Sequence, residues 1–412
     1  MFLRKFAFIL IFLTAFFSTT QVNALVQTSF QPNLSTLATI ESMYQGWKYE
    51  SLTTFYLSNG KQIKEPTIQF FRSGQAVENK GEAIKGYIQS SPNHLFTIQE
   101  TTVQNIYYEK APISDLVLAL NEDFPDPSAL FYQGIYYAYA TADNRSATRK
   151  NSSILVSTSI DNEHYSTAKS AIAKLPSWID ATRGFWAPEV VFLNGKFVMY
   201  FSPIDKKTGL RVLAVATSKF PDHGFVVENN PLLSDVDKQG YIDASVFTDN
   251  NGKNYLLFKN EGNQQGKSSS IWIQPLSADG LKITGKKQKL LESTQIPNPP
   301  NNDNKIMVPL IENPYLIQKD GVYTLFFSAG NWMSKNYFTG YAQTTSLDKP
   351  FTYKGPLVTT ASMGGEGYGV GGLSAGKDLN GFYLLFHGWT SPSETSYEQF
   401  GKRVLFRAHL DW

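Results

Sequence analysis

The chain has 412 residues, of which 42% are hydrophobic and 14% aromatic, and its 37 basic and 35 acidic side chains leave a net charge of +2. This length is too great for one small domain, and the near-neutral charge excludes the strongly basic surface of a nucleic-acid-binding protein. Cysteine is absent, which excludes disulfides and thiolate metal sites. The aromatic side chains must fill a core or line a surface on which a ligand stacks.

The first 24 residues are typical of a signal peptide. Arg4 and Lys5 precede an apolar run from Phe6 to Phe17, and the small-residue stretch VNA ends at Ala24. The run is shorter than the roughly 20 residues of a membrane-spanning helix, which argues against the alternative of a membrane anchor. We expect cleavage after Ala24 and a secreted or periplasmic protein with no later membrane-spanning segment.

Residues 25–112 are predicted to form a small separate domain. Apolar spacing favours a helix over residues 37–47, while residues 67–71 and 95–108 have the β-branched and aromatic content of strands. These patterns predict a small α+β accessory domain, and no residue pattern assigns it a role.

From Ile113 to Trp412 one pattern recurs five times. A glycine-containing turn precedes an aromatic-rich strand in YQG-IYYAYAT, LNG-KFVMYFS, DNNG-KNYLLFK, KDG-VYTLFFS and DLNG-FYLLFHG. The turn glycines, about 60 residues apart, are Gly134, Gly195, Gly252, Gly321 and Gly381. Such a repeat accommodates four antiparallel strands, which make one propeller blade. The predicted fold class is all-β: a five-bladed β-propeller over residues 113–412, preceded by the small α+β domain.

Three acids are predicted to face the axis of this propeller, because the first strand of every blade lines the central channel. Counting back from the turn glycines places Asp126, Asp243 and Glu312 at one register, which Ala187 and Gly372 occupy in blades 2 and 5. The acids could be solvated strand ends, ligands of a hard cation, or a general acid, a general base and a third group that tunes one of them. The shared register argues against solvated strand ends, and the apolar neighbours of each acid favour catalysis over a calcium site.

The segment from Ile113 to Trp412 resembles glycoside hydrolase family 43, the five-bladed propeller arabinanases, arabinofuranosidases and β-xylosidases. The similarity is carried, in order, by PDPSALF, FWAPEV, YIDASVFTDNNGKNYLLFKNEGN, IENPYLIQKDGVYTLFFSAGNW, YLLFHGW and GKRVLFRAHLDW. It implies an enzyme that cleaves arabinose- or xylose-containing plant polysaccharides or oligosaccharides with inversion of the anomeric centre. Residues 25–112 lie outside the resemblance.

The resemblance also implies a role for each acid. Asp126 would be the general base that deprotonates water, and Glu312 the general acid that protonates the leaving oxygen. Asp243 would keep Glu312 protonated by like-charge repulsion and hold its orientation. Inversion implies that base and acid stand roughly 6.5–9.5 Å apart, with the water between them.

Three further residues belong to the expected substrate-binding site. Trp186 in FWAPEV would wall the sugar pocket, with the alternative of a core tryptophan packed between blades. Arg403 resembles a family arginine that helps to fix the carboxylates, and Lys402 beside it leaves that alignment ambiguous. His387 in FHGW is the third, with the alternative of a packed strand residue. Glu189 lies off the acidic register and is interpreted as structural.

A metal is not expected to be required. Many family members have a histidine in a GPGH-like motif near the start of the fifth blade, associated with a central metal or water cluster. Here the stretch is GVGGLSAG, with Gly372 at that place, which argues against a structural calcium. We expect a carbohydrate as the partner and no required cofactor.

Two other functions are alternatives to this one. One is a non-catalytic sugar-binding propeller. The other is a fructan-cleaving propeller, whose acid motif is built on a Glu-Cys pair that this chain cannot form. The motifs do not distinguish arabinose from xylose as the substrate sugar, or exo from endo cleavage. They also do not specify the oligomeric state.

Overall fold

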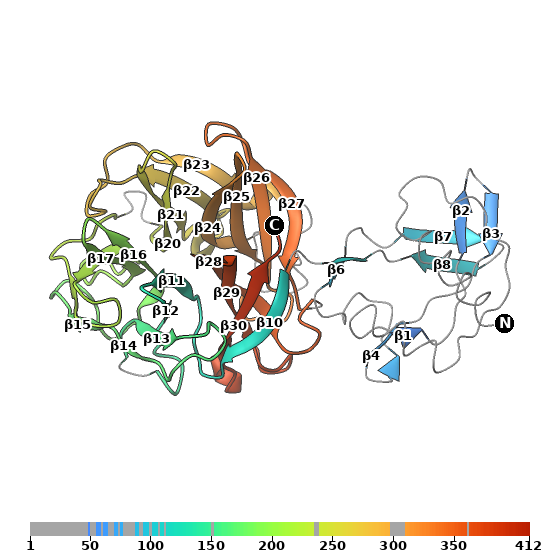
Figure 1. The fold of residues 1–412 in the computed structure, drawn as a ribbon, viewed down its shortest axis with the longest axis horizontal. Helices are drawn as coiled ribbons and strands as arrows, with labels where there is room; N and C mark the ends of the chain where they lie inside the picture. Colours follow the sequence, from blue (N-terminus) through green and yellow to red (C-terminus); the bar gives the residue numbers. More distant parts are fainter. Residues whose placement is uncertain are drawn as a thin grey trace. The chain divides into compact units, whose positions relative to one another are not determined.

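The computed structural model describes residues 113–412 except 150–151, 235–238, 297–309 and 361, together with the backbone of short strands between residues 48 and 110. The chain divides into two compact units, residues 1–109 and 110–412, and each is described by itself (Figure 1). The predicted signal peptide and the predicted helix over residues 37–47 lie outside the described residues.

The first unit contains short antiparallel strand pairs. β2 (Phe55–Ser58) and β3 (Lys61–Lys64) form one hairpin, and β7 (His94–Ile98) and β8 (Thr101–Asn105) form another. A three-stranded sheet and a further pair are formed by β1 (Lys48–Tyr49), β4 (Phe70–Arg72) and β5 (Gln75–Ala76), and by β6 (Tyr87–Gln89) and β9 (Tyr108–Lys110). The predicted strands at 67–71 and 95–108 overlap β4, β7 and β8.

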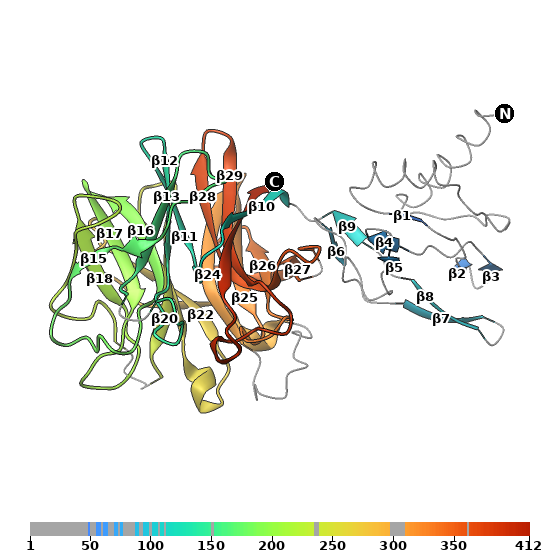
Figure 2. The same cartoon turned by 90° about the horizontal axis from the view of Figure 1, so that it is seen from below.

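The second unit is the predicted five-bladed β-propeller (Figures 1 and 2). The first strands of neighbouring blades contact one another and form the inner wall. Blade 1 consists of β11 (Ser128–Tyr132), β12 (Ile135–Ala140), β13 (Leu155–Ser159) and β14 (Lys169–Ser170). Blade 2 consists of β16 (Trp186–Leu193), β17 (Lys196–Ser202), β18 (Ala214–Ser218) and β19 (Phe225–Val227), with β15 (Ile172–Lys174) parallel to β19.

Blades 3 and 4 have the same plan. Blade 3 consists of β20 (Tyr241–Thr248), β21 (Asn254–Asn260), β22 (Ser270–Pro275) and β23 (Gln288–Glu292). Blade 4 consists of β24 (Ile311–Lys319), β25 (Val322–Ala329), β26 (Phe338–Thr344) and β27 (Thr352–Val358).

The fifth blade is completed by the strand that begins the propeller. Its three inner strands are β28 (Tyr368–Asp378), β29 (Gly381–Trp389) and β30 (Arg403–Leu410), and its outermost strand is β10 (Ile113–Leu120). β10 pairs antiparallel with β30, with Ile113 opposite Leu410 and Ser114 opposite His409. This pairing closes the ring and covers the edge of β30, which would otherwise expose unpaired backbone groups.

Glycine is required at several hairpin turns between the first and second strands. In blades 1, 2 and 4 the turn pairs Gln133–Gly134, Asn194–Gly195 and Asp320–Gly321 all have positive φ, between 48° and 81°. Two consecutive positive φ angles define a type I′ turn, which matches the right-handed twist of the flanking strands. This local requirement explains why the glycine pattern predicts the hairpins.

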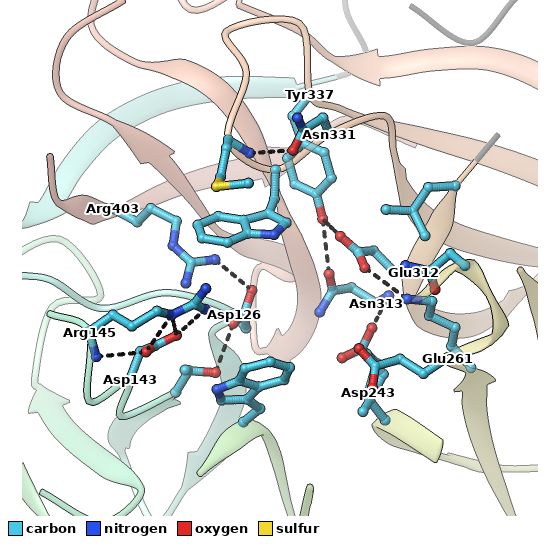
Figure 3. Close-up of a pocket in the computed structure, with 18 of the residues that line it drawn as sticks. Asp126, Asp143, Arg145, Asp243, Glu261, Glu312, Asn313, Asn331, Tyr337 and Arg403 are labelled. Carbon is cyan, nitrogen blue, oxygen red and sulfur yellow. Dashed lines mark hydrogen bonds and ion pairs between the residues drawn. The ribbon is translucent and has the colours of Figure 1, made fainter. Parts of the chain in front are cut away.

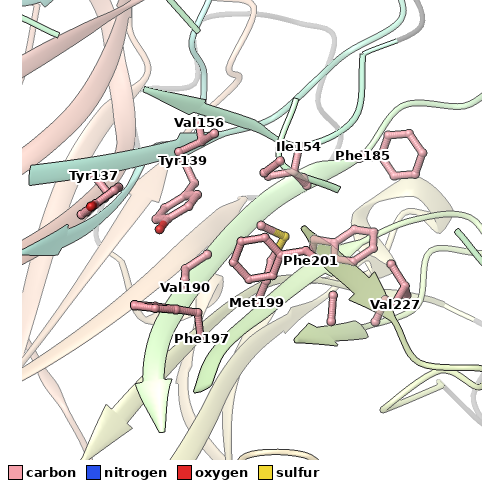
Figure 4. Packing of buried hydrophobic residues seen from close by; sticks show 14 of the residues in the cluster. Tyr137, Tyr139, Ile154, Val156, Phe185, Val190, Phe197, Met199, Phe201 and Val227 are labelled. Atoms are coloured by element: carbon pink, nitrogen blue, oxygen red, sulfur yellow. The ribbon is translucent and has the colours of Figure 1, made fainter. Parts of the chain in front are cut away.

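Aromatic side chains fill the spaces between neighbouring blades. Between blades 1 and 2, one buried cluster includes Tyr137, Tyr139, Phe197 and Phe201 (Figure 4). Further clusters pack blade 2 against blade 3, blade 3 against blade 4, and blade 5 against blade 1. Because each fully buried large apolar side chain contributes about 1.5–3 kcal/mol, these interfaces hold the ring together.

One residue near the start of each inner strand adopts a left-handed backbone conformation. These five residues, with φ between 43° and 63°, are Asp126, Ala187, Asp243, Asn313 and Gly372. In blades 2 to 5 the pairing register shifts at this point, so the inner strand is bulged. A bulge re-aims the side chains around it, and here it lets two consecutive positions face the same pocket.

The predicted register of Glu312 is wrong by one residue. Asn313 occupies the left-handed position that Asp126 and Asp243 hold in their blades, and Glu312 precedes it, at the position of Trp186 in blade 2. Counting from the glycines missed this offset because the turn between β20 and β21 is longer than the two-residue turn of blade 4.

Candidate active site

The inner strands surround a pocket of about 450 Å³ (Figure 3). Its lining includes the predicted acids Asp126, Asp243 and Glu312, and the predicted binding residues Trp186 and Arg403. In Figure 3, Asp126 and Arg403 lie on one side of the pocket, and Asp243 and Glu312 lie on the other. The fold therefore brings three carboxyl groups from three blades together around one space.

Asp126 is held by two donors and still opens to the pocket. The Thr141 hydroxyl donates to Oδ2 at 2.7 Å, and Nη1 of Arg403 donates to Oδ1 at 3.3 Å. The backbone N–H of Ala187 donates to Oγ1 of Thr141 at 2.8 Å, which leaves the hydroxyl proton free to point at Asp126. The Asp126 side chain is 15% exposed. A fixed carboxylate that remains accessible suits a proton acceptor.

Arg403 is anchored from several directions. Its Nη2 donates to the Tyr397 hydroxyl at 3.1 Å, and its backbone N–H donates to Oδ1 of Asp123 at 3.0 Å. The side chain of Lys402, by contrast, donates to a backbone carbonyl at the end of β10. Of the two neighbouring cations, Arg403 is the one that contacts Asp126.

Asp243 and Glu312 form a buried pair of carboxyl groups. Oδ2 of Asp243 accepts the backbone N–H of Asn313 at 3.0 Å. Burial, followed by the charge of Glu312, raises the pKa of Asp243. Two carboxyl groups in a low-dielectric site cannot both ionise easily, so the pair retains a proton more readily than an isolated, exposed carboxyl group.

Two residues that the sequence analysis did not identify hold Glu312. The Tyr337 hydroxyl donates to Oε1 at 2.8 Å, and Nζ of Lys259 donates to Oε2 at 3.1 Å. Burial and the charge of Glu312 raise the pKa of Tyr337 well above its usual value of 10, so the phenol stays neutral. Oδ1 of Asn313 lies 3.1 Å from the same hydroxyl, which can turn to it when Oε1 carries a proton.

The sequence carries a local signal for Lys259. The repeat KNYLLFK ends in lysine, where two of the other repeats, KFVMYFS and VYTLFFS, end in serine. No comparable local pattern marks Tyr337, which lies in the loop between β25 and β26.

Two tryptophans and an arginine line another part of the pocket. Trp186 and Trp332 both belong to the lining. The Arg145 guanidinium lies 5.7 Å from the ring centre of Trp186 and 5.1 Å from that of Trp332, and Asp143 holds it by an ion pair of 2.6 Å. Trp186 is also covered by the guanidinium of Arg211, 3.5 Å from its ring centre. Indole rings at a pocket wall can stack on the C–H faces of sugars.

His387 contacts Asp126 rather than the pocket, whose lining does not include it. It is fully buried, and its Nδ1 accepts the backbone N–H of Asp126 at 2.9 Å. Burial and the charge of Arg403 lower the pKa of His387 well below 6.5, so the ring is neutral. Since Nδ1 accepts a hydrogen bond, the ring proton sits on Nε2, and a protonated nitrogen cannot ligate a cation. His387 therefore does not fit a calcium site.

A second, smaller cavity of about 30 Å³ lies between the inner strands. Its polar lining includes the residues two positions after the left-handed ones: Ser128, Glu189, Ser245, Tyr315 and Ser374. Burial raises the pKa of Glu189 to about 8, against the opposing effect of hydrogen bonds from Ser128 and the backbone of Val246. Glu189 lies two positions after the left-handed residue of its blade, off the register of Asp126 and Asp243.

The described residues lack two features that would indicate a metal site or a membrane-spanning segment. Among these residues, no three histidine, aspartate or glutamate side chains cluster as metal ligands. Within the same part of the chain, no helix has the length and apolar character needed to cross a membrane.

Comparison with known proteins assigns this propeller and its acidic pocket to a family of glycoside hydrolases. Residues 119–412 match the sequence profile of Glycosyl hydrolases family 43, and the chain belongs to this family. A solved structure of a thermostable family-43 glycoside hydrolase matches with a TM-score of 0.58 at 25% identity, covering 70% of this chain and 91% of that one.

Characterised relatives are similar over part of their length. The chain is 26% identical over 221 residues to a β-D-galactofuranosidase of Aspergillus niger, a match that covers 50% of this chain and 56% of that protein. It is 25% identical over 237 residues to a xylosidase/arabinosidase of Bacteroides ovatus, covering 52% of this chain and 67% of that protein. The chain thus spans only about half to two thirds of the length of these relatives.

Proposed function

We propose that this chain is a secreted glycoside hydrolase that cleaves arabinose- or xylose-containing plant polysaccharides or oligosaccharides by a single inverting displacement. The observation that carries the proposal is the opposition of Asp126 to the Asp243–Glu312 pair across one pocket. A base and an acid on opposite sides of a sugar ring are what inversion requires.

The proposed reaction assigns one role to each acid. Asp126 accepts a proton from a water molecule, whose oxygen attacks the anomeric carbon. Glu312 gives its proton to the glycosidic oxygen, which departs with the electron pair of the broken C–O bond. Asp243, buried beside Glu312, keeps a proton on the pair through like-charge repulsion. Arg403 and Thr141 orient Asp126, and the chemistry needs no metal.

The proposed substrate class rests on the relatives and on the pocket wall. The relatives are named for galactofuranose, xylose and arabinose, and Trp186 and Trp332 supply aromatic surface at the pocket wall. A non-catalytic sugar-binding propeller is less well supported, because binding alone has no need of a buried carboxyl pair with its own donors. Burying charged groups costs free energy that a binding protein could avoid.

The experiment tests hydrolysis of nitrophenyl α-L-arabinofuranoside, nitrophenyl β-D-xyloside, arabinan and xylan. NMR then identifies the anomeric configuration of the sugar that is released first. We expect cleavage of at least one substrate with inversion. A retained anomer would contradict the single displacement. Absence of hydrolysis on all four substrates would contradict the assignment to this substrate class.

Export is the part of the proposal that rests on residues 1–24 alone. Their basic start, short apolar run and terminal small residues support cleavage after Ala24. Mass spectrometry of the protein from its native host should find a mature chain that begins at residue 25, and a mature chain that still begins at Met1 would contradict export by this route.

A further inference from the structure

The second strand of each blade, or in blade 1 the residue directly after it, contributes one buried side chain at the same position of the ring. Cα pairings place Ser202 opposite Trp186, Lys259 opposite Ile242, Ser328 opposite Glu312 and His387 opposite Gly371. In blade 1, the backbone of Thr141 bonds to Pro125 at the equivalent point. We call these five buried residues the second-strand ring: Thr141, Ser202, Lys259, Ser328 and His387.

In three blades the ring residue accepts a hydrogen bond from the next blade. The N–H groups of Ala187 and Gly372 donate to the hydroxyls of Thr141 and Ser328, each at 2.8 Å. The N–H of Asp126 donates to His387 at 2.9 Å. Each donor is the left-handed residue of an inner strand, so the ring holds the strained starts of these strands in place.

Blades 2 and 3 depart from this pattern. The buried Ser202 hydroxyl of blade 2 has no hydrogen-bond partner in the described part of the chain, and the ring residue of blade 3 is a lysine, which cannot accept a hydrogen bond. The N–H of Asn313, the left-handed residue of the next blade, donates instead to Oδ2 of Asp243 at 3.0 Å. The Lys259 ammonium is directed at Oε2 of Glu312, 3.1 Å away. Asp243 and Glu312 thus belong to one hydrogen-bonded network that runs through Asn313 and Tyr337, and Lys259 joins this network at Glu312.

The charges around Lys259 are predominantly acidic. The side chain is 1% exposed, and the groups that act on it are Glu312, Asp243 and Glu261. Asp243 in turn experiences Glu312, Lys259 and, more weakly, Asp126. Because the site is buried, the attraction between the ammonium and a carboxylate is much stronger than in water. The ammonium lies against Oε2 of Glu312, and negative charge develops on this carboxyl group as it gives up its proton to a leaving oxygen.

We propose that Lys259 is a positioning residue that makes Glu312 a stronger acid, by stabilising and orienting the carboxylate left after proton transfer to the glycosidic oxygen. This inference rests on the proposed function of Glu312. The O–H bond of Glu312 breaks as the new O–H bond to the leaving oxygen forms, and Lys259 keeps its own proton throughout.

The test is Lys259→Met, which preserves length and removes charge, with Ser202→Ala as the matched change at the ring position of blade 2. The alkaline limb of the pH–rate profile should move upward by about 1–3 pH units, because the neighbouring cation no longer favours ionisation. The rate on arabinan or xylan oligosaccharides should fall about tenfold or more, and that on nitrophenyl glycosides less, because nitrophenolate leaves without full protonation. Ser202→Ala should keep the wild-type limb.

An alkaline limb that stays in place or moves downward would overturn the proposal, as would equal rate losses on both classes of leaving group. Should Lys259→Met alone fail to fold, the double variant Lys259→Met/Glu312→Gln leaves no unpaired charge between these two residues. It should match Glu312→Gln in its nitrophenyl rate and pH profile, because Lys259 would have lost the group through which it acts. A further loss or shift would overturn the proposal. An inactive wild-type protein would instead contradict the proposed function itself.

Discussion

His387, in the last blade, accepts the backbone N–H of Asp126, in the first blade, at 2.9 Å. The acceptor is a neutral imidazole with no exposed surface, and the donor belongs to a residue in a left-handed conformation with φ of 52°. This hydrogen bond joins the last blade to the first and fixes the backbone of Asp126, the proposed base.

Replacing His387 should therefore affect both stability and the proposed base. His387→Leu leaves the Asp126 N–H buried without an acceptor, which should lower the free energy of unfolding by about 1–3 kcal/mol and reduce kcat. His387→Gln keeps a carbonyl acceptor and should lose less of both. Denaturant unfolding and steady-state kinetics measure the two effects, and equal losses for the two variants would contradict the hydrogen-bonding role.

Loss of Asp126 should abolish hydrolysis regardless of the leaving group. Asp126→Ala removes the proposed proton acceptor for water, so the rate should fall about 10²–10⁴-fold on both nitrophenyl glycosides and oligosaccharides. Asp249→Asn, in the turn between β20 and β21, is a control that should keep the wild-type rate. A substantial rate of Asp126→Ala on either class would exclude Asp126 as the base.

Loss of Glu312 should depend on the leaving group. A sugar alkoxide is a poor leaving group without protonation, whereas nitrophenolate departs readily, so Glu312→Ala should retain much more of its rate on nitrophenyl glycosides. The ratio of kcat/KM values on the two classes is the measurement. The same fractional loss on both would exclude Glu312 as the acid.

Glu189 should make the protein less stable as pH rises. Its pKa is raised from 4.5 in the unfolded chain to about 8 in the folded one by burial, so the folded state holds a proton that the unfolded state releases. Its stabilising contribution is complete below about pH 4.5 and is lost as pH rises to about 8, on the order of a few kcal/mol. Denaturant unfolding across this pH range should show that the free energy of unfolding falls less steeply with pH for Glu189→Gln than for the wild type. Glu398→Gln, a change at an exposed residue, is the control and should keep the wild-type pH dependence. If Glu189→Gln also kept the wild-type pH dependence of the free energy of unfolding, Glu189 would not be the group responsible.

Chelation should not reduce activity. His387 directs Nδ1 to the Asp126 N–H and carries its proton on Nε2, so it offers no lone pair to a calcium ion. Dialysis against EDTA should leave both kcat and the melting temperature unchanged. A loss of rate that added calcium restores would show that a cation is held by residues other than His387.

Much of the propeller was readable from the amino-acid sequence because its signals are local. A type I′ turn needs positive φ at adjacent residues, which places a glycine such as Gly134 or Gly321 at a fixed point of the first hairpin in blades 1, 2 and 4. The aromatic-rich strands that follow these turns are also predictable, because their composition is a local feature of the sequence. Acids near the starts of the inner strands, at Asp126 and Asp243, could be aligned by counting from those glycines.

Tertiary structure decided what depends on distant pairing. The partnership of β10 with β30 joins Ser114 to His409, and no local pattern encodes such a contact. The one-residue offset of Glu312 depends on the length of a turn in another blade. Glu312 accepts hydrogen bonds from Lys259, in a strand of another blade, and from Tyr337, in a loop of its own blade. Sequence spacing orders residues along a strand, but hydrogen bonds across blades form only when the closed ring sets the distances between them.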